Sequence, residues 1–133
     1  MLLETTGDAE ATATAVMRDD DVEAAQRLVR RMPVGESVVD AILQLVRSAR
    51  PEETELEEVR NTVAWGPGPR ASQALMLAVR ARALMDGRYA PSVDDVVELA
   101  DPILRHRMAL SFAARAEGTT VSGVIDRLCR PFR

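Results

Sequence analysis

The residue of this sequence with the clearest chemistry is Arg70, which ends the segment WGPGPR at residues 65–70. Two Gly-Pro pairs cannot continue a helix, so Gly68 and Pro69 form a turn that sets Arg70 in the first turn of the apolar helix that follows. A cation there opposes the helix dipole. It is favoured if an anion approaches, because backbone N–H groups and a guanidinium both suit phosphate oxygens. On spacing alone a purely structural turn is the favoured interpretation, and a phosphate contact is the alternative. Trp65 is predicted to fix the turn against the protein.

Other side chains with reactive chemistry are few. His106 has no Cys or second His near it, and Cys129 is the single cysteine, so the sequence predicts neither a metal site nor an internal disulfide. All 17 basic residues are Arg, whereas a P-loop needs a Lys that reaches the terminal phosphates of the nucleotide. We therefore expect no ATPase activity and no tight ATP binding from this chain alone.

Charge is divided unevenly along the chain. Residues 1–64 carry 14 acids and 7 Arg, residues 65–133 carry 7 acids and 10 Arg, and the whole chain has a net charge of −4. An acidic protein is an unfavourable nucleic-acid binder, so a DNA-binding helix-turn-helix is only a remote alternative. The roles of Arg80, Arg82 and the basic segment Arg105 to Arg133 stay open. For that segment a contact with a neighbouring subunit is favoured over a nucleic-acid patch.

The elements that must position Arg70 are predicted to be helices. A chain of 133 residues fits one domain, and its core must be aliphatic because only four residues are aromatic. Apolar residues recur at helical spacing through most of the sequence, while strand alternation is limited to a weak hint around Tyr89. We expect an all-α helical bundle of about five to seven helices, with little or no sheet.

Capping residues and prolines place the individual helices. Residues 71–85 are apolar almost all round, which predicts a central helix surrounded by the others. A short helix is expected to begin in the Glu-rich segment PEETELEE. The other predicted helix starts are Asp19 or Asp20, Ser37, Ser92 with Asp95 as its capping partner, Pro102, and Thr120.

Residues 1–18 have no sustained helical period and are predicted to be a linker, followed by one helical domain at 19–133. The N-terminus lacks the pattern of a signal peptide, and no apolar run approaches the roughly 18 residues of a membrane span. We expect a cytoplasmic protein with no membrane partner.

From Val63 to Phe112 the sequence resembles the lid of MoxR-family AAA+ ATPases nearly throughout. The specific segments are WGPGPRASQ, RARAL, DGRYAPSVDDV and PILRHR. The upstream segment VRRMPVGESVVDAILQLVRSARP and the opening LLETTG also resemble that family's lid and the stretch that joins it to the ATPase core. The resemblance therefore covers almost the whole chain.

This resemblance implies that Arg70 is the sensor 2 arginine, placed by Gly68 and Pro69. It would reach the γ-phosphate of ATP, which the core of the same polypeptide would hold together with Mg. Residues 1–18 would lead in from that core. The resemblance further implies a parent ATPase that forms a homo-oligomeric ring, a hexamer, and acts as a chaperone that remodels or matures partners, among them von Willebrand A domain proteins. The lid would rotate as a lever. The alternative is a free-standing helical adaptor that binds a protein partner through an apolar groove, without nucleotide.

Overall fold

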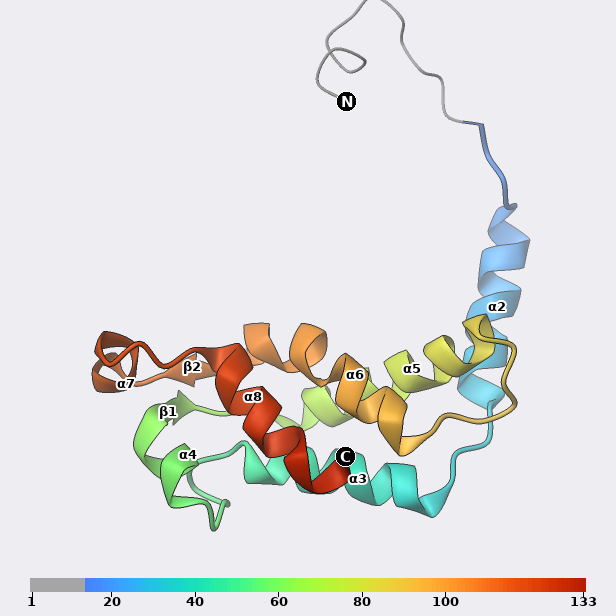
Figure 1. The fold of residues 1–133 in the computed structure, drawn as a ribbon. Helices are drawn as coiled ribbons and strands as arrows, with labels where there is room; N and C mark the ends of the chain where they lie inside the picture. Colours follow the sequence, from blue (N-terminus) through green and yellow to red (C-terminus); the bar gives the residue numbers. More distant parts are fainter. Residues whose placement is uncertain (1–13) are drawn as a thin grey trace, which may run out of the picture.

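The computed structural model describes residues 14–133 and shows a long helical body (Figure 1). Residues 1–13 of the predicted linker lie outside the described residues. The last five linker residues, 14–18, are exposed and not helical, and the first helix of the described residues begins at Asp19.

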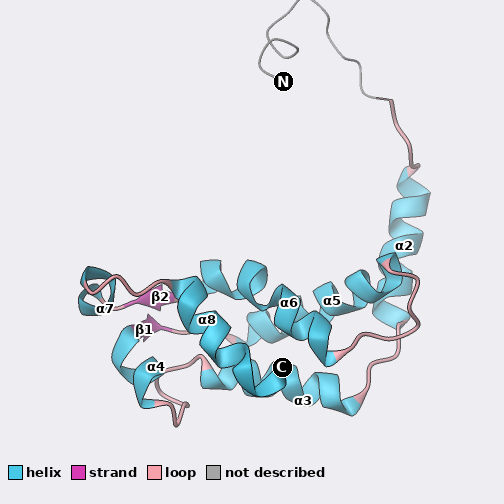
Figure 2. Cartoon of the chain, in the orientation of Figure 1, coloured by secondary structure: helices cyan, strands magenta, loops and turns pink. Residues whose placement is uncertain are grey.

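Seven α-helices, two short 3₁₀ turns and one two-stranded sheet make up the described residues, which confirms the predicted all-α class (Figure 2). In chain order these are α2 (Asp19–Arg31), α3 (Glu36–Ser48), α4 (Glu57–Thr62), β1 (Val63–Trp65), α5 (Pro69–Met85), α6 (Val93–Leu104), η1 (Arg105–Arg107), β2 (Ala109–Leu110), α7 (Phe112–Ala116), α8 (Val121–Cys129) and η2 (Arg130–Phe132).

The core lies where α5 packs against α6 and α3, and α8 covers it by packing against both α6 and α3 (Figure 1). Its largest fully buried side chains are aliphatic: Ile42, Leu45, Leu75, Leu104 and Ile125 are all less than 2% exposed. At one end α2 stands away from the body, has no buried residue and contacts α5. At the other end lie α4, α7 and the small sheet.

Two of the predicted helix starts are confirmed. Ser92 is the N-cap of α6: its hydroxyl accepts a hydrogen bond from the Asp95 amide, and the Asp95 carboxylate accepts one from the Ser92 amide at 2.7 Å. Thr120 is the N-cap of α8, with its hydroxyl accepting from the Gly123 amide at 3.1 Å. Both side chains satisfy amides that the first helical turn leaves free.

Three other predicted starts are wrong. The N-cap of α3 is Gly35 and not Ser37, and Asp19 lies in the first turn of α2 because Arg18 is its N-cap. Acids in these first turns suit the positive end of the helix, and in α2 Asp21 also takes part in the cap, because its carboxylate accepts from the Arg18 amide at 3.1 Å. Pro102 does not begin a helix but lies within α6, two residues before its last residue. A proline there removes only one hydrogen bond, and the buried neighbours Ala100 and Leu104 hold the helix together across it.

The sheet was not predicted where it occurs. β1 pairs antiparallel with β2, with Val63 opposite Leu110 and an irregularity before Trp65. The Tyr89 region, which carried the strand hint, is an irregular loop with Tyr89 92% exposed. Strands of two and three residues are too short to give an alternating pattern, so they depend on the pairing that the helices on either side impose.

Helix α5 is central but is not surrounded by other helices. Its fully buried positions form one stripe with a spacing of four residues: Ala71, Leu75, Val79 and Ala83. The other apolar residues of α5 are mostly half-buried, because α2 contacts only one end of the helix and leaves part of its flank open. The prediction of an all-round buried helix is therefore wrong.

Candidate functional site

The turn before α5 is anchored by its prolines and glycines. Pro67 is among the fully buried side chains. A Cβ on Gly66 would lie 2.6 Å from the Ala49 carbonyl oxygen, so the turn lies directly on the end of α3. Trp65 is 60% exposed, so the prediction that it fixes the turn is wrong, and Pro67 fills that role instead.

Arg70 lies where the sequence placed it. Gly68 is the N-cap of α5, Pro69 is its first residue, and Arg70 follows with an exposed side chain. Proline at this position fixes the backbone dihedral that the helix needs. Among the described residues Arg70 has no ion-pair partner, although most of the arginines that follow it along the chain have one. The guanidinium is thus available to an anion from outside the chain.

The backbone contributes less to this end of α5 than the sequence suggested. Pro69 has no N–H, and the Ala71 amide donates to the Gly68 carbonyl at 2.9 Å. No side chain caps the helix, and its first turn has no acid. The anion-binding capacity therefore rests on the Arg70 guanidinium, with the Arg70 amide as the additional donor.

The structure brings Arg80 and Arg82 to contacts within the chain and not to the Arg70 turn. Arg80 donates from Nη1 to the Arg30 carbonyl at 3.3 Å, which joins α5 to the last turn of α2. Arg82 pairs with Asp86 and with Glu98 of α6, each at 3.1 Å. Both arginines therefore tie α5 to its neighbours.

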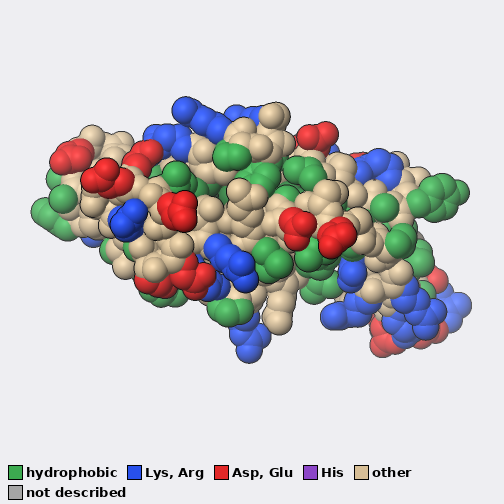
Figure 3. Space-filling view, turned by 90° about the horizontal axis from the view of Figure 1, so that it is seen from below, with side chains coloured by type: hydrophobic (Ala, Val, Ile, Leu, Met, Phe, Trp, Pro, Cys, Tyr) green, Lys and Arg blue, Asp and Glu red, His purple; other side chains and the backbone are tan. Residues whose placement is uncertain are grey.

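The basic C-terminal segment does not form a free patch either. Four of its six arginines have partners in the chain, and the clearest are Arg127 with Glu58 of α4 at 2.5 Å and Arg133 with Asp126 at 2.7 Å. On the face in Figure 3, arginines and acids are intermixed. Arg115 and Arg130 are exposed without such pairs among the described residues. The contact predicted for this segment with a neighbouring subunit stays a prediction.

The loop after α5 is held by a network around Arg88. Its guanidinium donates to both carboxylate oxygens of Asp95, at 2.7 and 2.8 Å, and to Asp86 at 2.9 Å. The Asp95 side chain is only 6% exposed. Hydrogen bonds from Arg88 hold the pKa of Asp95 below its usual value, and hydrogen bonds from Arg88 and Arg82 lower the pKa of Asp86. This network holds the loop between α5 and α6 and so fixes the start of α6 relative to the end of α5.

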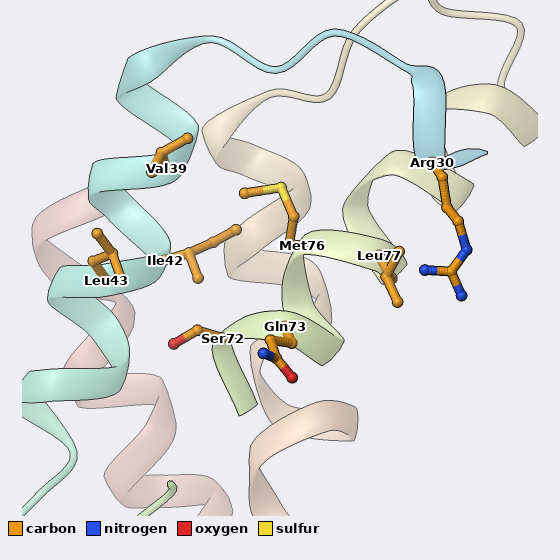
Figure 4. A pocket seen from close by; sticks show the side chains of 8 residues that line it. All are labelled: Arg30, Val39, Ile42, Leu43, Ser72, Gln73, Met76 and Leu77. Carbon is orange, nitrogen blue, oxygen red and sulfur yellow. The ribbon is translucent and has the colours of Figure 1, made fainter. Parts of the chain in front are cut away.

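An apolar hollow of about 530 Å³ lies between α3 and the N-terminal half of α5 (Figure 4). Figure 4 shows Ile42 and Val39 of α3 facing Met76 of α5, with Arg30 of α2 at one side. Leu43 at its edge is 40% exposed. The hollow begins within one turn of Arg70, because Ser72 and Gln73 also line it.

No group of three or more His, Cys, Asp or Glu in the described part of the chain is arranged to hold a metal ion. Cys129 is buried, and burial raises the pKa of its thiol. No helix from residue 14 onward is long and apolar enough to cross a membrane. The cytoplasmic location stays a prediction.

The geometry defines a class of module: an all-α domain in which Arg70 projects from a turn that lies against the end of α3. The Arg70 side chain is exposed and has no ion-pair partner among the described residues.

Comparison with known proteins gives the family. The sequence model of the AAA lid domain matches residues 55–128, so the chain belongs to that family. The predicted resemblance to the lid of MoxR-family AAA+ ATPases is confirmed. The chaperone MoxR1 of Mycobacterium tuberculosis (strain ATCC 25618 / H37Rv) is 32% identical over 117 residues, which are 87% of this chain and 31% of that protein. The uncharacterised protein YeaC of Bacillus subtilis (strain 168) is 31% identical over 117 residues, 88% of this chain and 34% of that protein.

A solved structure agrees with the sequence relatives. The crystal structure of a candidate ATPase from Cytophaga hutchinsonii superposes with a TM-score of 0.78 at 29% identity, covering 84% of this chain and 34% of that one. The chain thus spans about a third of the length of the relatives that it matches. The remaining two thirds of those proteins have no counterpart in this sequence.

Proposed function

We propose that this lid serves a MoxR-type AAA+ ATPase by placing Arg70 against the terminal phosphate of ATP. The observation that carries the proposal is the exposed guanidinium of Arg70 in the first turn of α5, which has no ion-pair partner among the described residues. A guanidinium in that position suits phosphate oxygens, and the family membership supplies a domain to hold the nucleotide. The bond that is hydrolysed would be a phosphoanhydride bond of the bound nucleotide.

Of the ATP and Mg that the parent would bind, the described residues suit only the terminal phosphate of ATP. Arg70 and its amide offer donors only, which suits an anion. The described residues offer no cluster that would hold Mg, so we assign it no ligand here. The parts played by this chain are to stabilise negative charge at Arg70 and to carry the displacement of Arg70 into α5.

The larger setting is part of the same proposal. MoxR1 is named as a chaperone, and we propose a chaperone-like role for the parent of this lid. The homo-oligomeric ring, its hexameric state and the von Willebrand A domain partners rest on the family resemblance. Sedimentation of the full-length parent with ATP would test the ring directly.

The test is Arg70→Ala in the full-length parent. We expect turnover to fall on the order of 100-fold, as when one charge-stabilising donor is removed, in rings that still assemble. Arg47→Ala is the matched control, because Arg47 is an exposed α3 arginine without an ion pair among the described residues, and it should leave turnover unchanged. Unchanged turnover in Arg70→Ala rings would refute the proposal.

The isolated chain provides a second check. Arg70→Ala should leave the free energy of unfolding within about 0.5 kcal/mol of wild type, because surface substitutions rarely exceed that value. A slight gain is expected, since the change removes a cation from the positive end of α5. If the variant unfolded, Arg70 would be structural and the proposal would lose its main support.

The adaptor alternative has one observation in its favour, the apolar hollow between α3 and α5. If the chain were an adaptor, its binding to a protein partner would depend on this hollow and not on nucleotide. Met76→Arg, which would place a charge in the hollow, would then abolish the parent's biological activity, while Arg70→Ala would leave it intact. The reverse pattern supports the nucleotide function.

A further inference from the structure

The turn that presents Arg70 is fastened at Pro67 to a residue 17 positions earlier in the sequence. Arg50, just beyond the end of α3, donates from Nε to the Pro67 carbonyl at 2.7 Å. This is a hydrogen bond from a charged donor, which is stronger than one between neutral groups. It joins α3 to the middle of the turn, three residues before Arg70.

Arg50 is itself held in place. Its side chain is only 17% exposed, and Nη1 pairs with the Glu53 carboxylate at 2.6 Å. The Arg50 carbonyl accepts from the amides of Glu53 and Thr54, at 3.1 and 2.9 Å, so its backbone lies in a tight turn. One guanidinium therefore bridges two segments, using the separate donors of its planar fork.

The path from this contact to Arg70 has little freedom. Gly66 lies against the Ala49 carbonyl, the Pro67 side chain is buried, and Pro69 fixes the first dihedral of α5. Immediately after Arg70, Ala71 is fully buried in the core. The backbone at Arg70 is thus fixed from both sides while its side chain stays exposed.

From this arrangement we infer that Arg50 is a positioning residue for Arg70: it holds the Pro67 carbonyl so that the guanidinium of Arg70 is presented in one place. The inference rests on the proposed function, because it needs Arg70 to contact a phosphate. It concerns a different residue and makes a separate claim. Arg50 does not touch the nucleotide and acts only through the turn.

The test compares variants of the full-length parent in steady-state hydrolysis and in binding of ATP and ADP. Arg50→Met keeps the aliphatic stem and removes every donor. We expect kcat/KM for ATP to fall by up to about 100-fold, the cost of misplacing a catalytic group by about 1 Å. Affinity for ADP should be unchanged, because ADP lacks the phosphate that Arg70 would contact. Arg47→Met, which changes an exposed arginine three residues earlier in the last turn of α3, is the control and should change neither.

A double variant separates positioning from other roles. If Arg50 acts only through Arg70, then Arg50→Met together with Arg70→Ala should be no worse than Arg70→Ala alone. Arg50→Lys keeps a positive charge and a donor without the fork, so it should lose less than Arg50→Met and again only toward ATP. If Arg50→Met fails to fold, as circular dichroism would show, Arg50→Lys decides the question by the same ATP-to-ADP comparison.

The outcomes distinguish the two claims. Loss of turnover in Arg70→Ala but not in Arg50→Met would overturn the positioning role and leave the proposed function standing. Additive losses in the double variant, or equal losses of ATP and ADP binding, would also overturn it, since Arg50 would then act by another route. Unchanged turnover in Arg70→Ala would remove the proposed function, and the inference with it.

Discussion

Replacing Gly66 by alanine should destabilise the turn by steric contact alone. A Cβ at this position would lie 2.6 Å from the Ala49 carbonyl oxygen and 2.8 Å from the Arg50 Cα, and both neighbours are backbone atoms that cannot rotate away. Relief requires the turn to move off the end of α3, which would also lengthen the Arg50–Pro67 hydrogen bond. Overpacking of this kind costs about 1–3 kcal/mol.

The chain contains a matched control two residues further on. A Cβ on Gly68 would meet nothing within 4 Å, and the Gly68 φ of −81° suits alanine. Both substitutions remove the same backbone freedom from the unfolded chain, a stabilisation of about 0.4–1 kcal/mol that cancels in the comparison. The difference between the two variants thus isolates the contact at Gly66.

Urea unfolding of the isolated chain, followed by circular dichroism, measures that difference. We expect Gly66→Ala to have a lower midpoint than Gly68→Ala, with similar slopes, because the surface exposed on unfolding is the same. Equal midpoints, or a less stable Gly68→Ala, would refute the argument. They would mean that the turn is not pressed against α3 in solution.

Two further predictions concern the core and the pH dependence of stability. Leu75→Ala should lower the free energy of unfolding by about 2–5 kcal/mol, because Leu75 is fully buried and the transfer of its three lost carbons alone accounts for about 2.4 kcal/mol. Thermal unfolding should show a smaller loss for Leu84→Ala, since Leu84 is only half-buried. Equal losses would contradict this ranking. The pKa of Asp95 is lower in the folded chain than in the unfolded chain, where a carboxyl has a pKa of about 3.9. The ionised carboxylate therefore stabilises the fold above that unfolded pKa, and this stabilisation is lost as the pH falls through the lower folded pKa. Between pH 7 and about pH 3, wild type should therefore lose more stability in urea than Asp95→Asn does; equal losses would show that the Arg88 contact does not form.

Local signals in the sequence were sufficient to predict a helical chain and to place the caps of α6 and α8. The Ser92 and Thr120 caps were predicted because a hydroxyl three residues before a free amide is a property of a few adjacent residues. The position of Arg70 was predicted for the same reason, since Gly68 and Pro69 determine it locally. The cap of α3 was predicted at Ser37 but is Gly35, and no comparable local signal marks it, because Gly35 caps without any side-chain hydrogen bond.

Features that depend on distant contacts were not predictable. The two strands pair residues more than 40 positions apart and are too short to show a pattern. Nothing in the sequence links Arg50 to Pro67, although the contact between them is among the shortest side-chain hydrogen bonds of the described residues. The apolar composition of α5 predicted burial all round, but composition does not show how many neighbours pack against a helix.

The one-sided burial of α5 determines how it would act as a lever. Its 17 residues span about 25 Å. Helix α5 makes its most extensive contacts with α6, and Arg82 pairs with Glu98 across the same two helices. We therefore expect a displacement of Arg70 toward a phosphate to move α5 and α6 as one body, since close-packed interiors have low compressibility and transmit strain. In contrast, α2 has no buried residue, so the bending that such a rotation requires is expected where α2 meets the body and not within α5.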